Sequence, residues 1–133
     1  MPTARDPERN DIDFAEFEER LRRRQRELFA DVQREVAKHR GQQQADLLEQ
    51  ADPDDRAVAD LLSHLNLAEI DRDVDELRAI QAALGRIASG SYGICQSCGR
   101  PIGVERLRAI PETPLCIECQ ARIERLKETT PSL

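Results

Sequence analysis

The chain contains no tryptophan, one tyrosine and three phenylalanines, so aromatic side chains make up only 3% of its 133 residues. A large globular core normally contains more aromatic bulk. With 39% hydrophobic and 35% charged residues, the composition favours solvated helices over a packed sandwich. The sequence also lacks an apolar run of membrane-spanning length and an apolar signal segment. These absences predict a cytoplasmic protein without membrane contact.

Basic residues are not in excess either: 20 lysines and arginines face 26 aspartates and glutamates, which gives a formal net charge of −6. Proteins that hold duplex phosphates usually present a basic field, so bulk nucleic-acid binding is disfavoured. A local exception is the run from Arg20 to Arg26, which holds five arginines. This run is either a solvated helix face balanced by neighbouring glutamates or a contact for phosphates or an acidic partner. No nucleophile with its base and no phosphate-binding glycine loop is present, so we expect no enzymatic activity.

Against this background, the four cysteines are the most informative residues. Cys95 and Cys98 form one C-x-x-C pair, and Cys116 and Cys119 form a second pair after a gap of 17 residues. The alternatives are two disulfides, a redox dithiol or four unrelated buried thiols. No signal segment supports the first, and no strand-helix-strand pattern supports the second. Two such pairs suit the four-thiolate tetrahedron of zinc. We therefore expect one structural Zn²⁺, with no open position for catalysis.

Apolar residues recur at helical spacing in two long segments. The first runs from Asp11 to about Gln50, is weakly interrupted by Gly41, and carries the stripe Phe14, Phe17, Leu21, Leu28, Val32 and Val36. Pro53 breaks the pattern, and a second stripe follows over about 33 residues from Ala57 to Ser89, a helix about 50 Å long. Two such helices joined by a short turn predict a long antiparallel coiled-coil hairpin whose outermost part is acidic.

The expected organisation is all-α and has three parts. Residues 1–10 form a flexible leader, residues 11–90 form the coiled-coil hairpin with its acidic tip at 52–57, and residues 91–133 form the zinc-finger module and a C-terminal helix. In that last helix, Ile123 and Leu126 are expected to pack inward. The aspartates of the tip are typical of turns and helix N-caps, but they also suit contact with a metal ion or basic groups of a partner.

Two separate motifs resemble the DksA/TraR family of bacterial transcription regulators. The stretch Tyr92-Gly93-Ile94-Cys95-Gln96-Ser97-Cys98-Gly99, followed by Leu115-Cys116-Ile117-Glu118-Cys119, is similar to the zinc-finger signature of that family. Asp52, Asp55 and Ala57 occupy the positions of the family's D-x-x-D-x-A tip motif. The resemblance covers about residues 12 to 128.

The resemblance implies a regulator that binds bacterial RNA polymerase and inserts the coiled-coil tip into the secondary channel. Asp52 and Asp55 would then act near the catalytic magnesium and change the stability of the open complex without reading DNA sequence. Arg72 and Arg106 are candidates for contacts with the polymerase or with phosphate.

Three positions depart from family members that respond to the alarmone guanosine tetraphosphate. Those members carry basic residues where this chain has Ala79, Ile110 and Gln120. Because charge-assisted contacts to the phosphates are lost, we expect weak or absent alarmone dependence unless Arg72, Arg78 and Arg106 compensate. Two alternative functions are a zinc-ribbon protein that binds nucleic acid directly and a coiled-coil adaptor that pairs between chains. An intramolecular hairpin would instead be a monomer.

Overall fold

The computed structural model describes residues 12–129, so the predicted leader lies outside the described residues. The helices in order are α2 (Phe14–Arg40), α3 (Gln42–Glu49), α4 (Arg56–His64), the 3₁₀ turn η1 (Ala68–Ile70), α5 (Asp71–Ser89), α6 (Val104–Ala109) and α7 (Ile117–Thr129). Between residues 12 and 129 there is no named strand, and Ile94 and Pro101 form an isolated β-bridge. The all-α prediction is therefore confirmed. No helix in this range is long and apolar enough to cross a bilayer.

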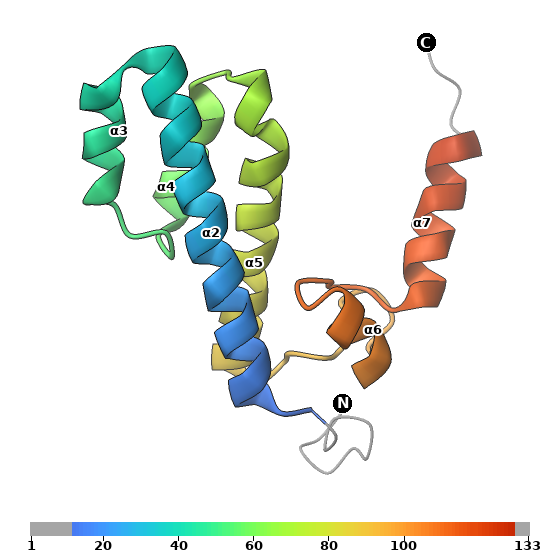
Figure 1. Ribbon diagram of the computed structural model, residues 1–133. Coiled ribbons are helices and arrows are strands. Elements are labelled where there is room, and N and C mark those ends of the chain that lie inside the picture. Colours follow the sequence, from blue (N-terminus) through green and yellow to red (C-terminus); the bar gives the residue numbers. More distant parts are fainter. Residues whose placement is uncertain (1–11, 130–133) are drawn as a thin grey trace.

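Helices α2 and α5 lie side by side and form the centre of the molecule (Figure 1). Helix α2 begins where the Asp13 carboxylate accepts a hydrogen bond from the backbone N–H of Glu16 at 3.1 Å, which satisfies one of the free amides of the first turn. Helix α5 ends at Gly90, whose φ of +86° is the left-handed conformation that glycine favours. The facing stripes of the two helices are buried in one core cluster.

The chain reverses direction at the end of α2 and again before α5 (Figure 1). At Gly41, φ is +100° and ψ is 158°, so helix α3 folds back along α2 instead of continuing it. Asn66, with φ of +53°, lies between α4 and α5, and α4 packs on α5. The Arg40 guanidinium donates to the carbonyl of Leu65 at 2.6 Å, so the two reversals lie side by side.

This arrangement corrects the prediction of two long arms, the first only weakly interrupted at Gly41, with the segment 52–57 at the outermost end. That end is formed by the reversals at Gly41 and Asn66, and the segment 52–57 lies back along α2 and α5 (Figure 1). The physical reason is that folding back adds the apolar side chains Ala45, Leu48, Val58 and Leu62 to the core. Burying a leucine or valine side chain stabilises a fold by about 1.5–3 kcal/mol. A glycine in a helix interior destabilises the helix by only about 1 kcal/mol relative to alanine.

An apolar groove remains between the folded-back helices α3 and α4. It has a volume of about 310 Å³ and is lined mainly by leucines and valines of α2, α3 and α4. Leu47 at its edge is 67% exposed and Leu61 is 59% exposed. The folded-back arrangement therefore leaves two large apolar side chains in contact with solvent.

The zinc-finger module, here residues 91–129, is attached to the other end of α2 and α5. Its anchor is Tyr92, which is fully buried, contacts the rings of Phe14 and Phe17 at centroid distances of 6.1 and 5.9 Å, and donates its hydroxyl to the carbonyl of Pro111 at 2.8 Å. Burial raises the pKa of Tyr92, so the phenol stays neutral. The Arg20 guanidinium adds a hydrogen bond to the carbonyl of Arg108 at 2.9 Å.

Helix α7 extends away from the module as the predicted C-terminal helix (Figure 1). Ile123 is half-buried, but Leu126 is 61% exposed, which corrects the prediction that both side chains pack inward. Within residues 12–129, α7 makes no extensive contact with another helix.

Candidate metal centre and acidic loop

The four predicted zinc ligands come together in the module. The sulfur atoms of Cys95, Cys98, Cys116 and Cys119 all lie within 4.8 Å of one another, and Cys98 Sγ is 3.9 Å from Cys116 Sγ. A zinc ion bound at 2.3 Å by four thiolates in a tetrahedron sets sulfur–sulfur distances of about 3.8 Å. The spacing of the sulfurs thus fits one zinc ion.

Backbone hydrogen bonds shape the two knuckles. In the first, the N–H of Cys95 donates to the carbonyl of Arg100 at 2.8 Å and the N–H of Gly99 donates to the carbonyl of Cys95 at 3.0 Å. In the second, the N–H of Cys119 points to the sulfur of Cys116 at 3.5 Å, at the start of α7. These bonds turn the chain so that both cysteines of a pair face the same point.

The local electrostatics also favour a bound cation. Burial opposes ionisation of Cys95, but backbone amides of Cys116, Cys98 and Ser97 donate toward its sulfur and lower the pKa to about 6. The neighbouring Cys116 sulfur, together with burial, raises the pKa of Cys119 to about 12. Four clustered sulfurs cannot all be negative without a cation among them, so metal binding at this site releases protons.

Gly93 sets how the first knuckle joins the rest of the protein. Its φ is +87°, and a Cβ at this position would lie 2.6 Å from the Cδ1 atom of Ile12. Its carbonyl accepts a hydrogen bond from the N–H of Ile102 at 2.8 Å. A larger residue is therefore disfavoured by the backbone conformation, and its Cβ would also displace the end of the Ile12 side chain.

The two arginines proposed as partner contacts lie far apart. The Nε of Arg106 donates to the carbonyl of Leu115 at 2.9 Å, and its guanidinium also reaches the Thr113 hydroxyl at 3.4 Å, so it braces the second knuckle from within the module. Arg72 is exposed in the first turn of α5, at the end of that helix away from the zinc-finger module. Seventeen residues of α5 separate Arg72 from Ser89, about 26 Å of helix, so the two arginines do not form one site.

In the acidic loop, residues 50–55, the motif aspartates hold local backbone groups. One oxygen of Asp52 accepts from the N–H of Asp54 at 2.9 Å, and one oxygen of Asp55 accepts from the N–H of Ala57 at 2.9 Å and caps α4. This is the turn and N-cap chemistry that the sequence suggested as one alternative. The side chains of Asp52, Asp55 and Ala57 are nevertheless exposed.

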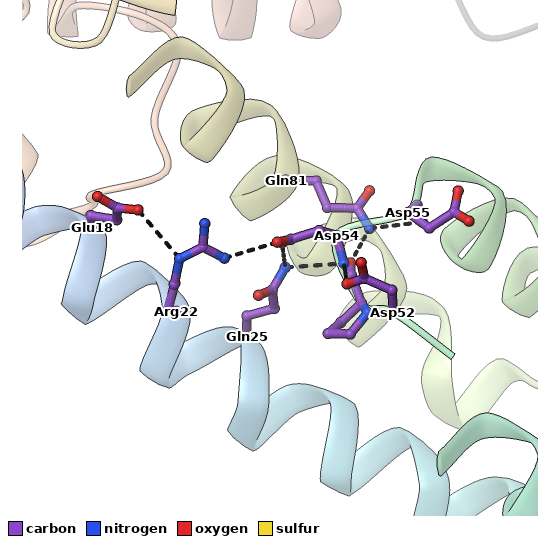
Figure 2. Close-up of polar contacts among 8 residues, drawn as sticks. Glu18, Arg22, Gln25, Asp52, Asp54, Asp55 and Gln81 are labelled. Atoms are coloured by element: carbon purple, nitrogen blue, oxygen red, sulfur yellow. Dashed lines mark hydrogen bonds and ion pairs between the residues drawn. The ribbon is translucent and has the colours of Figure 1, made fainter. Parts of the chain in front are cut away.

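A network that the sequence reasoning missed holds the acidic loop against the central helices (Figure 2). The Gln25 amide donates to Asp54 Oδ1 at 2.8 Å and to the carbonyl of Pro53 at 3.3 Å. The Arg22 guanidinium donates to the other Asp54 oxygen at 2.9 Å, and Gln81 on α5 donates to the Pro53 carbonyl. We call Arg22, Gln25, Gln81 and their acceptors in the loop the latch.

Asp54 is charged within the latch. Burial opposes its ionisation, but the hydrogen bonds from Gln25 and Arg22 and the charge of Arg22 outweigh burial and lower the pKa of Asp54 below its ordinary 3.8. Gln25 is only 3% exposed, although it lies on the apolar stripe of α2 between Leu21 and Leu28. A polar residue inside an apolar stripe was the signal that could have revealed the latch.

The arginine run on α2 is paired with acidic groups and backbone. Arg23 and Arg26 contact Glu19 at 3.7 and 3.6 Å. Arg24 donates to Glu76 on α5 at 2.7 Å, which keeps its pKa above the ordinary value. Of the two interpretations of the run from Arg20 to Arg26, these contacts match the helix face balanced by neighbouring acidic groups.

Three comparisons with known proteins agree. A family profile described as "Prokaryotic dksA/traR C4-type zinc finger" matches residues 90–125, which confirms the prediction of a single zinc cofactor. Proteins named RNA polymerase-binding transcription factor DksA are 35% identical in Caulobacter vibrioides, over 82% of this chain and 69% of the relative, and 32% identical in Escherichia coli, over 86% and 74%.

Two solved structures are similar along most of the chain. Transcription factor DksA2 from Pseudomonas aeruginosa has a TM-score of 0.64 and 33% identity, with 90% of this chain and 88% of that chain covered. The DnaK suppressor protein from Agrobacterium tumefaciens has a TM-score of 0.56 and 42% identity, with 84% and 95% covered. On the zinc-finger match, the sequence identity and the shared structure, this chain belongs to the DksA/TraR family.

Proposed function

We propose that this protein is a transcription regulator that binds bacterial RNA polymerase, as the names of its relatives state for them. The observation that carries the proposal is the combination, in one chain, of the four-cysteine metal centre with an acidic loop whose motif residues are all exposed. The first holds the zinc-finger module together, and the second offers exposed negative charge on the helical part of the chain.

In the proposed mechanism, the acidic loop enters the secondary channel of the polymerase. Asp52 and Asp55 each use one oxygen for a backbone hydrogen bond, and their carboxylates remain exposed to a partner. Carboxylate oxygens are suitable ligands for magnesium and acceptors for basic side chains. Near the catalytic centre, two such groups would change the stability of the open complex without touching DNA bases.

Direct binding to nucleic acid is the weaker alternative. The arginines of α2 that would contact phosphates are already engaged with glutamates or backbone carbonyls, and the net charge is −6. A phosphate would have to displace these pairs, which lowers its affinity.

We also propose that guanosine tetraphosphate has little effect on this regulator. Two of the positions that are basic in responsive members are the apolar Ile110 and the neutral Gln120, whose amide donates to Glu124 at 3.1 Å. Arg78, a possible substitute cation, donates to Asp60 at 2.7 Å. Titrating the alarmone into a transcription reaction tests this, and a large enhancement of regulation would contradict it.

The proposed function is tested with the double variant Asp52→Asn and Asp55→Asn. Asparagine keeps the oxygen that accepts from the backbone and is a good N-cap, so the loop should stay folded while both charges disappear. We expect zinc content and polymerase binding to be retained and the effect on open-complex lifetime to be lost. The readout is the lifetime of competitor-resistant promoter complexes with purified RNA polymerase.

A matched control is Asp46→Asn with Glu49→Gln, which removes two charges from α3 just before the acidic loop. Both residues are exposed, and the Asp46 oxygen that accepts from Gln42 at 2.7 Å is kept by asparagine. This control should regulate like the unchanged protein. Unchanged regulation by the Asp52/Asp55 variant, or equal loss in the control, would refute the role of the motif carboxylates.

A further inference from the structure

We propose that the latch holds the acidic loop in a withdrawn position and that the protein alternates between this folded-back form and an extended form with unbroken arms. The regulatory meaning of this switch rests on the proposed function, but the switch itself does not. It is carried by three features of the described residues: two adjacent hinges, a set of hydrogen bonds that the folded-back form alone explains, and apolar faces that suit both forms.

The hinges are short segments at the same end of the molecule, Gly41 in the first arm and Asn66 with Leu67 in the second. Gly41 has φ of +100° with no atom within 4 Å of the position of a Cβ, so nothing but its own backbone angles separates α2 from α3. Asn66 has φ of +53° between α4 and α5. The hydrogen bond from Arg40 to the carbonyl of Leu65 ties the two reversals together. Returning Gly41, Asn66 and the neighbouring Leu67, whose φ and ψ are −96° and 108°, to helical angles would therefore straighten both arms in one event.

The latch explains otherwise unusual polar residues. Gln25 is almost completely buried on an apolar stripe, and its amide is satisfied by Pro53 and Asp54 of the acidic loop. Gln81 reaches the same Pro53 carbonyl from α5 (Figure 2). In an extended hairpin the loop would lie 28 residues beyond Gln25, about 42 Å along the helix, and all of these bonds would be broken.

The apolar pattern is compatible with the extended form as well. Leu47 follows Val36 by 11 positions, about three turns of an unbroken helix, so the two side chains would share one face. In the folded-back form Val36 is buried, whereas Leu47 is 67% exposed. Leu62 precedes Ile80 by 18 positions, about five turns, and would also continue the core stripe of α5. Straightening would therefore bury Leu47 in the core, which offsets part of the loss of packing between α3 and α2.

The functional consequence is a difference in reach. The folded-back loop lies level with Gln25, about 22 Å short of the end of α2 at Arg40, because 15 residues of helix separate the two positions. The extended form would place it about 15 Å beyond Arg40, since ten further residues lead to Gln50. A partner that receives the acidic loop in a deep channel would bind the extended form and shift the population toward it.

The experiment measures the equilibrium directly. Spin labels are attached through non-natural amino acids at the exposed positions Arg26 and Glu49, which leaves all four cysteines for zinc. Their backbone separation is about 35 Å in an unbroken helix, and within about 20 Å when α3 packs against α2. Distances between the labels are measured by pulsed electron–electron double resonance for the full chain alone and with purified bacterial RNA polymerase.

The test variant is Gln25→Met with Gln81→Met, which keeps side-chain length and removes the amide donors. Gln33→Met on α2, outside the latch, is the matched control. We expect short distances in the unchanged protein and the control, and an increase of about tenfold or more in the ratio of extended to folded-back molecules in the latch variant. Added polymerase should produce the long distance in the unchanged protein.

Long distances in the unchanged free protein would overturn the proposal, as would short distances in the latch variant both with and without polymerase. The proposed function fails separately. If the latch variant lengthens but neither protein binds polymerase or alters transcription, the switch is supported and the function is refuted.

Discussion

Replacing Gly41 with alanine should shift the equilibrium strongly toward the extended form. The φ and ψ of Gly41, +100° and 158°, fall in a region that is essentially restricted to glycine and costs other residues about 1–3 kcal/mol. In the unbroken helix, alanine is favoured over glycine by about 1 kcal/mol. The two effects add because they act on opposite sides of the equilibrium. Their sum of about 2–4 kcal/mol raises the ratio of extended to folded-back molecules roughly 30- to 700-fold.

Gly85→Ala is the control for this prediction. Gly85 and Gly41 both have open space where a Cβ would be placed, but Gly85 lies inside α5 and is not among the glycines with positive φ. The control should stabilise α5 by about 1 kcal/mol without changing the distance between labels at positions 26 and 49. The assay is the spin-label distance in the free chain. A Gly41→Ala protein that keeps the short distance would refute the reasoning, because no steric contact offers another explanation.

Three further predictions concern other parts of the molecule. Removing zinc with a chelator should unfold α6 and α7, because structural zinc contributes on the order of 10 kcal/mol to such modules; circular dichroism should show partial loss of helix, and an unchanged spectrum would contradict it. Tyr92→Phe leaves the Pro111 carbonyl without its donor at 2.8 Å and should cost about 1–2 kcal/mol in urea unfolding, whereas an unchanged midpoint would argue against this anchor. The contribution of Asp54 to the latch is present above its ordinary pKa of 3.8 and lost as pH falls through the lowered folded value. Below pH 3.8, the fraction of molecules with the short spin-label distance should fall in the unchanged protein but not in Asp54→Asn. Equal pH dependence of the two proteins would exclude the Asp54 carboxylate as the cause.

The metal centre was predictable from the sequence because its determinants are local. Each C-x-x-C pair fixes two sulfurs by itself, so the ligand set could be read before any fold was known. The all-helical class was equally accessible from the two apolar stripes. In both cases a short-range pattern carries the physical cause of the structure.

The path of the arms could not be predicted in the same way. A glycine inside a helical pattern costs about 1 kcal/mol, too little to decide between a straight helix and a reversal at Gly41. Leu62 is buried here and would continue the stripe of α5 in a straight arm, so hydrophobic periodicity does not separate the two forms. What separates them is the contact of Gln25 and Gln81 with the acidic loop, which depends on residues 28 and 29 positions apart.

Gly93 has a consequence for the transfer of this zinc finger to other proteins. The absence of a side chain there lets Ile12 lie against the backbone where a Cβ would stand, so the segment just before α2 packs directly on the first knuckle. A graft that carries only the cysteines would keep metal affinity but lose this joint. Designers of hybrid regulators should therefore move Gly93 and its isoleucine neighbour as a pair.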